Sequence, residues 1–193
     1  TVTIHEKNGI KYAFLSYTTA TNGLVPAEDY YVNVYDEELV KQDIEKAADA
    51  DVIIVAMHWG SEYTHTPTAE ETEIAEYLSS LGVDLIIGSH PHVIQPIAYV
   101  GDTLVIYSLG NFISAQHPLG LEKIIGLLVG VDIVVDGDKV TFENLNYELL
   151  YTYCEPGYQN FSIMPFDVLD DTILANHEAI EQEYLAIVKS EGL

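Results

Sequence analysis

Three histidines follow two apolar segments of the chain, and their positions indicate a metal site. His58 comes directly after one apolar run, and His90 and His92 follow a second, shorter run. Neutral imidazole is a common ligand of Zn, Mn, Fe and related ions in proteins. Pro91 disfavours helical backbone at the residue before it, and residues two apart in an extended segment point the same way. We therefore expect His90 and His92 to present their rings on one side.

The segments that must position these histidines form a strand–helix–strand unit over residues 51–87. Residues 51–57 are continuously apolar, which is typical of a strand buried on both faces. Thr68 and Glu71 have capping-box spacing at the start of a helical pattern, and 85–87 is a second short apolar run. The right-handed crossover makes the two strands parallel, so both carboxyl ends lie on one edge of the sheet. That edge is where functional crevices lie in open α/β sheets.

The rest of the chain predicts an α/β fold in a single domain, residues 1–193, with a mixed or antiparallel second half. Asn8-Gly9 is a common hairpin turn, and Asp36 can cap a helix that runs to about residue 49. Strand-like runs, an irregular aromatic segment and a terminal helix capped by Asp170 or Asp171 follow. The expected strands are 1–6, 10–17, 93–100, 103–107, 124–135 and 139–150, and the irregular segment is 151–167.

Composition excludes some classes of partner. The chain has a formal net charge of −24, and its 7 basic residues are all lysines. Nucleic acid is held by neutralising its phosphates with Lys and Arg, so nucleic acid is not an expected partner. An anionic substrate would need a bound metal to attract it. Cys154 is the single cysteine, which excludes an intrachain disulfide and thiolate zinc sites that need several cysteines.

The metal interpretation has an ordinary alternative. A single histidine at a strand end is commonly a hydrogen-bonded structural residue, and a His-X-His pair can arise by chance. The joint placement of His58 with His90 and His92 on one predicted edge favours a ligand set. Three imidazoles without carboxylates would still leave a centre for two metal ions incomplete.

Three motifs around these histidines resemble one bacterial family. They are His58-Trp59-Gly60-Ser61-Glu62-Tyr63, Gly88-Ser89-His90-Pro91-His92-Val93 and Tyr107-Ser108-Leu109-Gly110-Asn111-Phe112. In this order and spacing they resemble the capsule-synthesis CapA family, also called poly-γ-glutamate synthesis proteins, over roughly residues 10–150. That family belongs to the calcineurin-like metallophosphoesterase superfamily. The resemblance implies a two-sheet sandwich flanked by helices.

The resemblance also implies metal ligands. His58 and His90 would share one divalent ion and His92 would serve a second, with Mn, Zn or Fe as the candidate metals. The family's bridging aspartate, Asp-X-His-like element and Asn-His pair are not recognisable upstream of His58. The chain therefore resembles the carboxyl-terminal portion of a CapA-like domain, with the remaining ligands and the upstream half of the domain elsewhere.

Four further residues of these motifs are weaker candidates. Glu62 could orient a ligand, and Trp59 could flank a substrate or simply pack beside the strand end. Ser108 and Asn111 could line the cleft, while an Asn after Gly110 could equally satisfy the backbone of a turn. His65 and His117 lie in expected loops near the motifs.

The resemblance implies two functions of different kinds. The first is a metal-dependent, phosphoesterase-like hydrolase, as the intact parent protein, acting on a phosphoester or on an anionic capsule polymer. The fragment alone is expected to be inactive. The second is a non-enzymatic module of the capsule assembly machinery that binds polymer or capsule-synthesis membrane proteins. Both imply an extracytoplasmic location at the cell envelope. Because the chain begins at Thr1 and contains no apolar run of about 18 residues, we expect any anchor to lie upstream.

Overall fold

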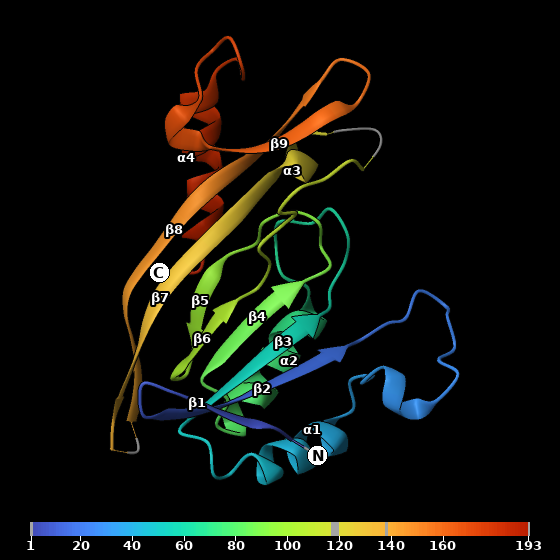
Figure 1. The fold of residues 1–193 in the computed structure, drawn as a ribbon, viewed down its shortest axis with the longest axis vertical. Helices are drawn as coiled ribbons and strands as arrows, with labels where there is room; N and C mark the ends of the chain where they lie inside the picture. Colours follow the sequence, from blue (N-terminus) through green and yellow to red (C-terminus); the bar gives the residue numbers. More distant parts are fainter. Residues whose placement is uncertain (1, 117–119, 138, 193) are drawn as a thin grey trace.

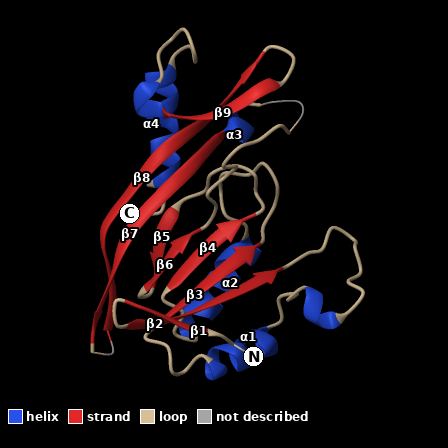
Figure 2. Cartoon of the chain, viewed as in Figure 1, coloured by secondary structure: helices blue, strands red, loops and turns tan. Residues whose placement is uncertain are grey.

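The computed structural model describes residues 2–116, 120–137 and 139–192, which form two β-sheets and their flanking helices (Figures 1 and 2). The first sheet has the strand order β1-β2-β3-β4-β6-β5, and the second has the order β7-β8-β9. The strands are β1 (Ile4–Lys7), β2 (Ile10–Thr18), β3 (Val52–His58), β4 (Leu85–Ser89), β5 (Ile97–Val100), β6 (Thr103–Ile106), β7 (Ile125–Asp136), β8 (Lys139–Glu155) and β9 (Gln159–Pro165). The helices are α1 (Glu37–Lys46), α2 (Ala69–Ser80), α3 (Leu121–Ile124) and α4 (His177–Val188), with 3-10 turns η1 (Asp29–Tyr31) and η2 (Phe166–Val168).

Four parallel strands dominate the first sheet. The central strands run parallel to one another, in the order β2, β3, β4 and β6. The edge strands β1 and β5 pair antiparallel with β2 and β6. The predicted β3–α2–β4 unit is confirmed, and β2–α1–β3 forms a second crossover of the same kind that the sequence did not predict. The carboxyl ends of all four strands therefore lie on one edge of the sheet.

The helix starts and the first turn follow the predicted local chemistry. The side chain of Asp36 accepts a hydrogen bond from the backbone of Leu39 at the start of α1. Thr68 and Glu71 form a complete capping box at the start of α2. Asn8 and Gly9 both have positive φ, at 56° and 81°, as the tight hairpin between β1 and β2 requires.

Two apolar cores hold the layers together. Helices α1 and α2 cover one face of the first sheet, where Val40, Ile44 and Leu78 pack against Val55 and Met57. The second core lies between β4–β6 and the second sheet, and α4 contributes Tyr184 and Val188 to it. In Figure 1 the long strands β7 and β8 run diagonally past the first sheet, with α4 beside them. Within the described residues, no helix is long and apolar enough to span a membrane.

Some predicted elements were wrong in extent or in type. The run from Val93 is a strand only from Ile97, because residues 93–96 form a loop in which the backbone N–H of Gln95 donates to the Ser108 carbonyl. The segment 151–167 is not irregular, since β8 continues to Glu155 and turns through Gly157 into β9. Its aromatic and β-branched residues favour that extension.

The terminal helix also begins later than predicted. Asp170 closes a separate turn by accepting hydrogen bonds from the backbone of Thr172 and Ile173. Helix α4 starts only at His177, after Asn176 in the left-handed conformation. The capping chemistry of the aspartate was therefore recognised, but the turn that it caps does not continue into the helix.

Candidate metal centre

His58 ends strand β3 at the carboxyl edge of the first sheet. It is in register with Thr18 of β2 on one side and with Ser89 of β4 on the other. The next residue after Ser89 is His90, so the strand pairing brings His58 and His90 together. Their ring centroids are 4.4 Å apart.

The loop after β4 does not have the extended backbone that Pro91 led us to expect. His90 and His92 have positive φ values of 99° and 60°. The loop is bent, and its Pro91 carbonyl accepts a hydrogen bond of 2.8 Å from the backbone N–H of Tyr63 in the neighbouring loop. The two rings nevertheless converge, with centroids 6.1 Å apart. The expected convergence was right, but a strained turn produces it rather than an extended segment.

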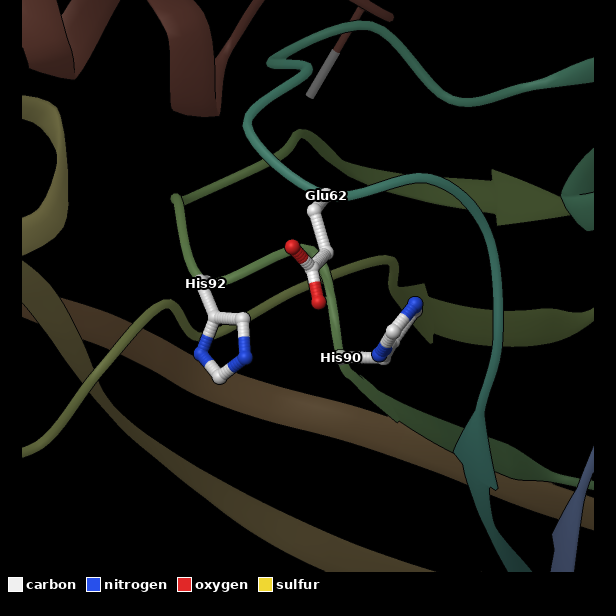
Figure 3. Close-up of side chains that lie close together, drawn as sticks. All are labelled: Glu62, His90 and His92. Carbon is white, nitrogen blue, oxygen red and sulfur yellow. The ribbon is translucent and has the colours of Figure 1, made fainter. Parts of the chain in front are cut away.

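Glu62 completes the cluster from the loop that follows β3. One ligand atom each from Glu62, His90 and His92 lie within 4.8 Å of one another. Figure 3 shows the carboxylate of Glu62 reaching into the space between the two imidazoles. The sequence suggested that Glu62 could orient a ligand, and the structure places its carboxylate where it could also hold an ion directly.

The hydrogen bonds of Thr18 favour one tautomer of His58. The Thr18 hydroxyl donates its one proton to the Ala20 carbonyl at 2.7 Å. That bond favours the imidazole as the donor at the 2.9 Å contact between Thr18 Oγ1 and His58 Nδ1. The Nε2 atom of His58 then carries a lone pair, which is the form that a metal ligand needs.

Asn111 determines the tautomer of His92 in the same way. Its amide nitrogen donates to the backbone carbonyls of His92 and Lys123, at 3.1 and 3.0 Å. The remaining amide oxygen lies 2.8 Å from His92 Nδ1, which must donate to it. His92 Nε2 is thus also left with a lone pair. Asn111 thus satisfies the backbone of its turn, as one interpretation expected, and it also orients a histidine of the cluster.

The electrostatics of the cluster suit a divalent cation. Burial, followed by the neighbouring His90, lowers the pKa of His58 below its ordinary value, so His58 is neutral at pH 7. Neutral imidazoles with one carboxylate match the donor preferences of Zn, Mn and Fe. The donor set present on these four side chains therefore fits a metal of the kind that the resemblance implies.

Two weaker candidates do not face the site. Trp59 is 0% exposed, and its indole N–H donates to the Tyr107 carbonyl at 3.0 Å. Ser108 is 1% exposed, and its hydroxyl accepts a hydrogen bond from Gly110 N. Both side chains are buried beneath the carboxyl edge of the first sheet, so neither can contact a substrate. The sequence could not separate these roles because a strand end carries inward and outward side chains alternately.

The loop histidine His65 lies apart from the cluster. His65 Nδ1 donates to the Ile94 carbonyl at 2.8 Å, and its ring meets Tyr184 edge-on. His65 therefore joins a loop to α4 and is not part of the cluster. His117 lies outside the described residues.

Backbone strain is concentrated at this cluster. Apart from Gly and Asn, four described residues have positive φ, and three of them are Tyr63, His90 and His92. Positive φ is unfavourable for bulky side chains and persists only where the surroundings enforce it. Such strain gathers at functional sites, which supports the assignment of this edge.

A buried carboxyl supports the loop that carries Glu62. Glu71 is 0% exposed, and its Oε2 accepts hydrogen bonds from the backbone and hydroxyl of Thr68 at 2.7 and 2.9 Å. Its Oε1 is buried with no hydrogen-bond donor among the described residues, as is Oε1 of Gln95, whose side-chain amide nitrogen donates to the Thr64 carbonyl. The carboxyl also lies against Gly60, which has φ of +78° and no room for a Cβ. These contacts join the 59–68 loop to α2 and to the loop after His92.

The pH dependence of the unfolding free energy should reveal the burial of the Glu71 carboxyl. Burial raises the pKa of Glu71 above its ordinary value, so folding favours the neutral acid. The contribution of neutral Glu71 to the free energy of unfolding is complete below the unfolded pKa of about 4.3. It is lost as pH rises through the higher folded pKa. Glu71→Gln keeps the capping acceptor and cannot ionise. We expect its stability relative to wild type to increase from pH 4 towards pH 8, measured by urea unfolding.

The exposed Glu73 of the same helix provides the control for that experiment. Glu73→Gln should leave the pH dependence of wild type unchanged. A Glu71→Gln protein that loses stability relative to wild type as pH rises would show that the folded state prefers the carboxylate.

The affinity for a divalent metal should depend on Asn111. Removing its amide frees the His92 ring and the turn that it holds. Loss of such an orienting partner typically lowers metal affinity about 10- to 100-fold. We expect Asn111→Ala to show a loss of this size for Zn²⁺ or Mn²⁺ in calorimetric titration. Asn146→Ala, at an exposed position of β8, should bind as wild type does, and equal affinities for all three proteins would contradict the role of Asn111.

Comparison with a solved structure defines the class of fold. The sulfate thiohydrolase SoxB of Thermus thermophilus, solved in complex with glycerol, is similar with a TM-score of 0.50 and 16% sequence identity. The match covers 94% of this chain and 29% of that chain. The two proteins thus share their fold, and the predicted mixed α/β architecture is confirmed.

Sequence comparison identifies the family. The model of the bacterial capsule synthesis protein PGA_cap matches residues 1–116. The chain belongs to this family. It is 32% identical over 125 residues to the PGA biosynthesis protein CapA of Bacillus subtilis, covering 60% of this chain and 31% of that protein. It is 34% identical over 117 residues to the capsule biosynthesis protein CapA of Bacillus anthracis, covering 56% and 28%. The chain spans about a third of the length of these relatives.

Proposed function

We propose that the protein acts in poly-γ-glutamate capsule biosynthesis through a metallophosphoesterase-type metal centre, part of which this chain supplies. The observation that carries the proposal is the convergence of Glu62, His90 and His92 within 4.8 Å, with His58 beside His90. The membership of the chain in the capsule synthesis family supports the biological process. The fold class supports the type of centre.

The four donors can be divided between two ions. His58 and His90 are close enough to share one ion, and His92 with Glu62 would face a second. A bound divalent ion would supply Lewis acidity and positive charge in a chain of net charge −24. This chain's own residues hold the imidazoles in the ligand tautomer through Thr18 and Asn111. The carboxylate donors expected of a complete centre would come from the remainder of the parent protein.

The substrate of the intact parent would be a phosphoester or the anionic polymer itself. Its location would be the cell envelope, outside the cytoplasm, next to membrane proteins of capsule synthesis. The test is metal content and phosphoester hydrolysis of the full parent protein, with His58→Ala as the comparison. We expect a divalent metal to co-purify with the parent and to be depleted in the variant. A metal-free parent that still supports capsule formation would overturn the metal centre.

A non-enzymatic role is the second candidate. The relatives are named for biosynthesis of the capsule or polymer and not for a hydrolytic reaction. A polyanion would be repelled by a surface of this charge unless cations bridge the two. Polymer binding that requires a divalent cation, in a parent that hydrolyses no phosphoester, would favour this role. Polymer binding that is insensitive to a chelator would argue against it.

A further inference from the structure

Lys123 is a nearly buried cation with no acidic partner. Lys123 is 9% exposed, although lysine is rarely buried unless it is paired with an acidic group. Acidic residues outnumber basic ones 31 to 7 in this chain, yet no carboxylate of the described residues forms an ion pair with Lys123. Its ammonium lies instead over the ring of Tyr63, 5.1 Å from the ring centroid. An unpaired charge in such a position needs an explanation.

The position of Lys123 is tied to the histidine cluster. Its backbone carbonyl accepts a hydrogen bond from the amide of Asn111, the residue that also orients His92. The Tyr63 ring on which the ammonium rests stacks against His92, with centroids 6.1 Å apart. Lys123 is therefore separated from the cluster by one aromatic ring.

Tyr63 is held in place at some conformational cost. Its φ is +63°, and its backbone N–H is fixed to the Pro91 carbonyl. Its hydroxyl accepts a hydrogen bond of 3.3 Å from the amide of Gln116. The residue is nonetheless 46% exposed, so a ligand can reach this side of the cluster. A fixed aromatic ring beneath an ammonium group places the charge at a defined point.

We propose that Lys123, supported on Tyr63, binds an oxyanion of the substrate beside the histidine cluster. The inference rests on the proposed function for the identity of the substrate, and it adds the group that recognises its negative charge. The oxyanion is either a free α-carboxylate of a γ-linked glutamate polymer or a phosphoryl group. In both cases the ammonium would gain the partner that it lacks, in a protein whose overall charge repels anions elsewhere.

The test compares anion binding by metal-free proteins. The probes are inorganic phosphate and a γ-linked glutamate trimer, titrated against the chain and followed by NMR shifts of Tyr63 and His92. Lys123→Met keeps the length and packing of the side chain without its charge. We expect it to lose about tenfold or more in affinity for one probe, as for a charge-assisted hydrogen bond. Lys123→Arg should retain most of the affinity. The probe that is affected identifies the oxyanion.

The matched control is Lys41→Met, on the exposed side of α1, which changes the net charge by the same amount. It should bind both probes as wild type does. The proposal is overturned if wild type binds neither probe, if Lys123→Met binds both as tightly as wild type, or if Lys41→Met loses as much. Because the titration contains no metal, these outcomes are independent of whether the parent protein binds a metal ion.

Discussion

Replacing His90 with alanine should nearly abolish divalent-metal binding by this chain. His90 is the residue that the two groupings of ligands share, since it lies beside His58 and also belongs to the set with Glu62 and His92. Loss of a residue that only orients a metal ligand already costs about 10- to 100-fold in metal affinity. Loss of a shared ligand should therefore cost at least about 100-fold. Isothermal titration with Zn²⁺ or Mn²⁺ at neutral pH measures the loss.

The order of effects among the histidines makes this prediction specific. His58→Ala leaves the Glu62, His90 and His92 set intact, so its affinity should fall less than that of His90→Ala. His5→Ala removes an exposed histidine of the first hairpin and should bind as wild type does. Equal losses for His5→Ala and His90→Ala would show that the measured ions bind the acidic surface, and the assignment of the centre would fail.

Replacing Trp59 with alanine should bring the domain close to unfolding. The side chain is 0% exposed, stacks on Tyr107 and donates to the Tyr107 carbonyl. Large-to-small changes at such positions cost about 3–5 kcal/mol, and the carbonyl would also lose its donor. Total stabilities of about 5–15 kcal/mol leave little margin for that loss. The free energy of unfolding in urea is the quantity to measure.

Two variants separate the contributions of Trp59. Trp59→Phe keeps most of the packing but removes the hydrogen bond, and we expect a loss of about 1–3 kcal/mol. Phe14→Ala, at a position of β2 that is 52% exposed, should cost much less than Trp59→Ala. If Trp59→Ala and Phe14→Ala had the same small effect, the indole could not be a central support of the strand ends.

The support that Trp59 provides explains why a glycine stands at the end of β4. A Cβ on Gly88 would overlap the Tyr107 carbonyl and lie 2.6 Å from the indole nitrogen of Trp59. The hydrogen bond between the indole and that carbonyl passes across Gly88, directly before Ser89 and His90. The three sequence motifs are thus joined physically at one place, which their spacing along the chain did not reveal.

Much of the scaffold followed from local sequence patterns. The β3–α2–β4 unit, the capping box of Thr68 and Glu71 and the Asn8-Gly9 turn depend on short-range periodicity, capping and turn preferences. Those properties are encoded within a few neighbouring residues. The gathering of His58 and His90 followed as well, because parallel strands must end on one edge.

The atoms that complete the site depend on contacts between distant segments. Thr18, Asn111 and Lys123 meet the histidine cluster across 19 to 40 positions of the chain or through another ring, and no local pattern predicts such contacts. The residue types and strand order were sufficient to indicate a metal site. Only the tertiary structure decided the tautomers of His58 and His92, the inward position of Trp59 and the strained turn at His90, because each is imposed by partners that folding alone brings together.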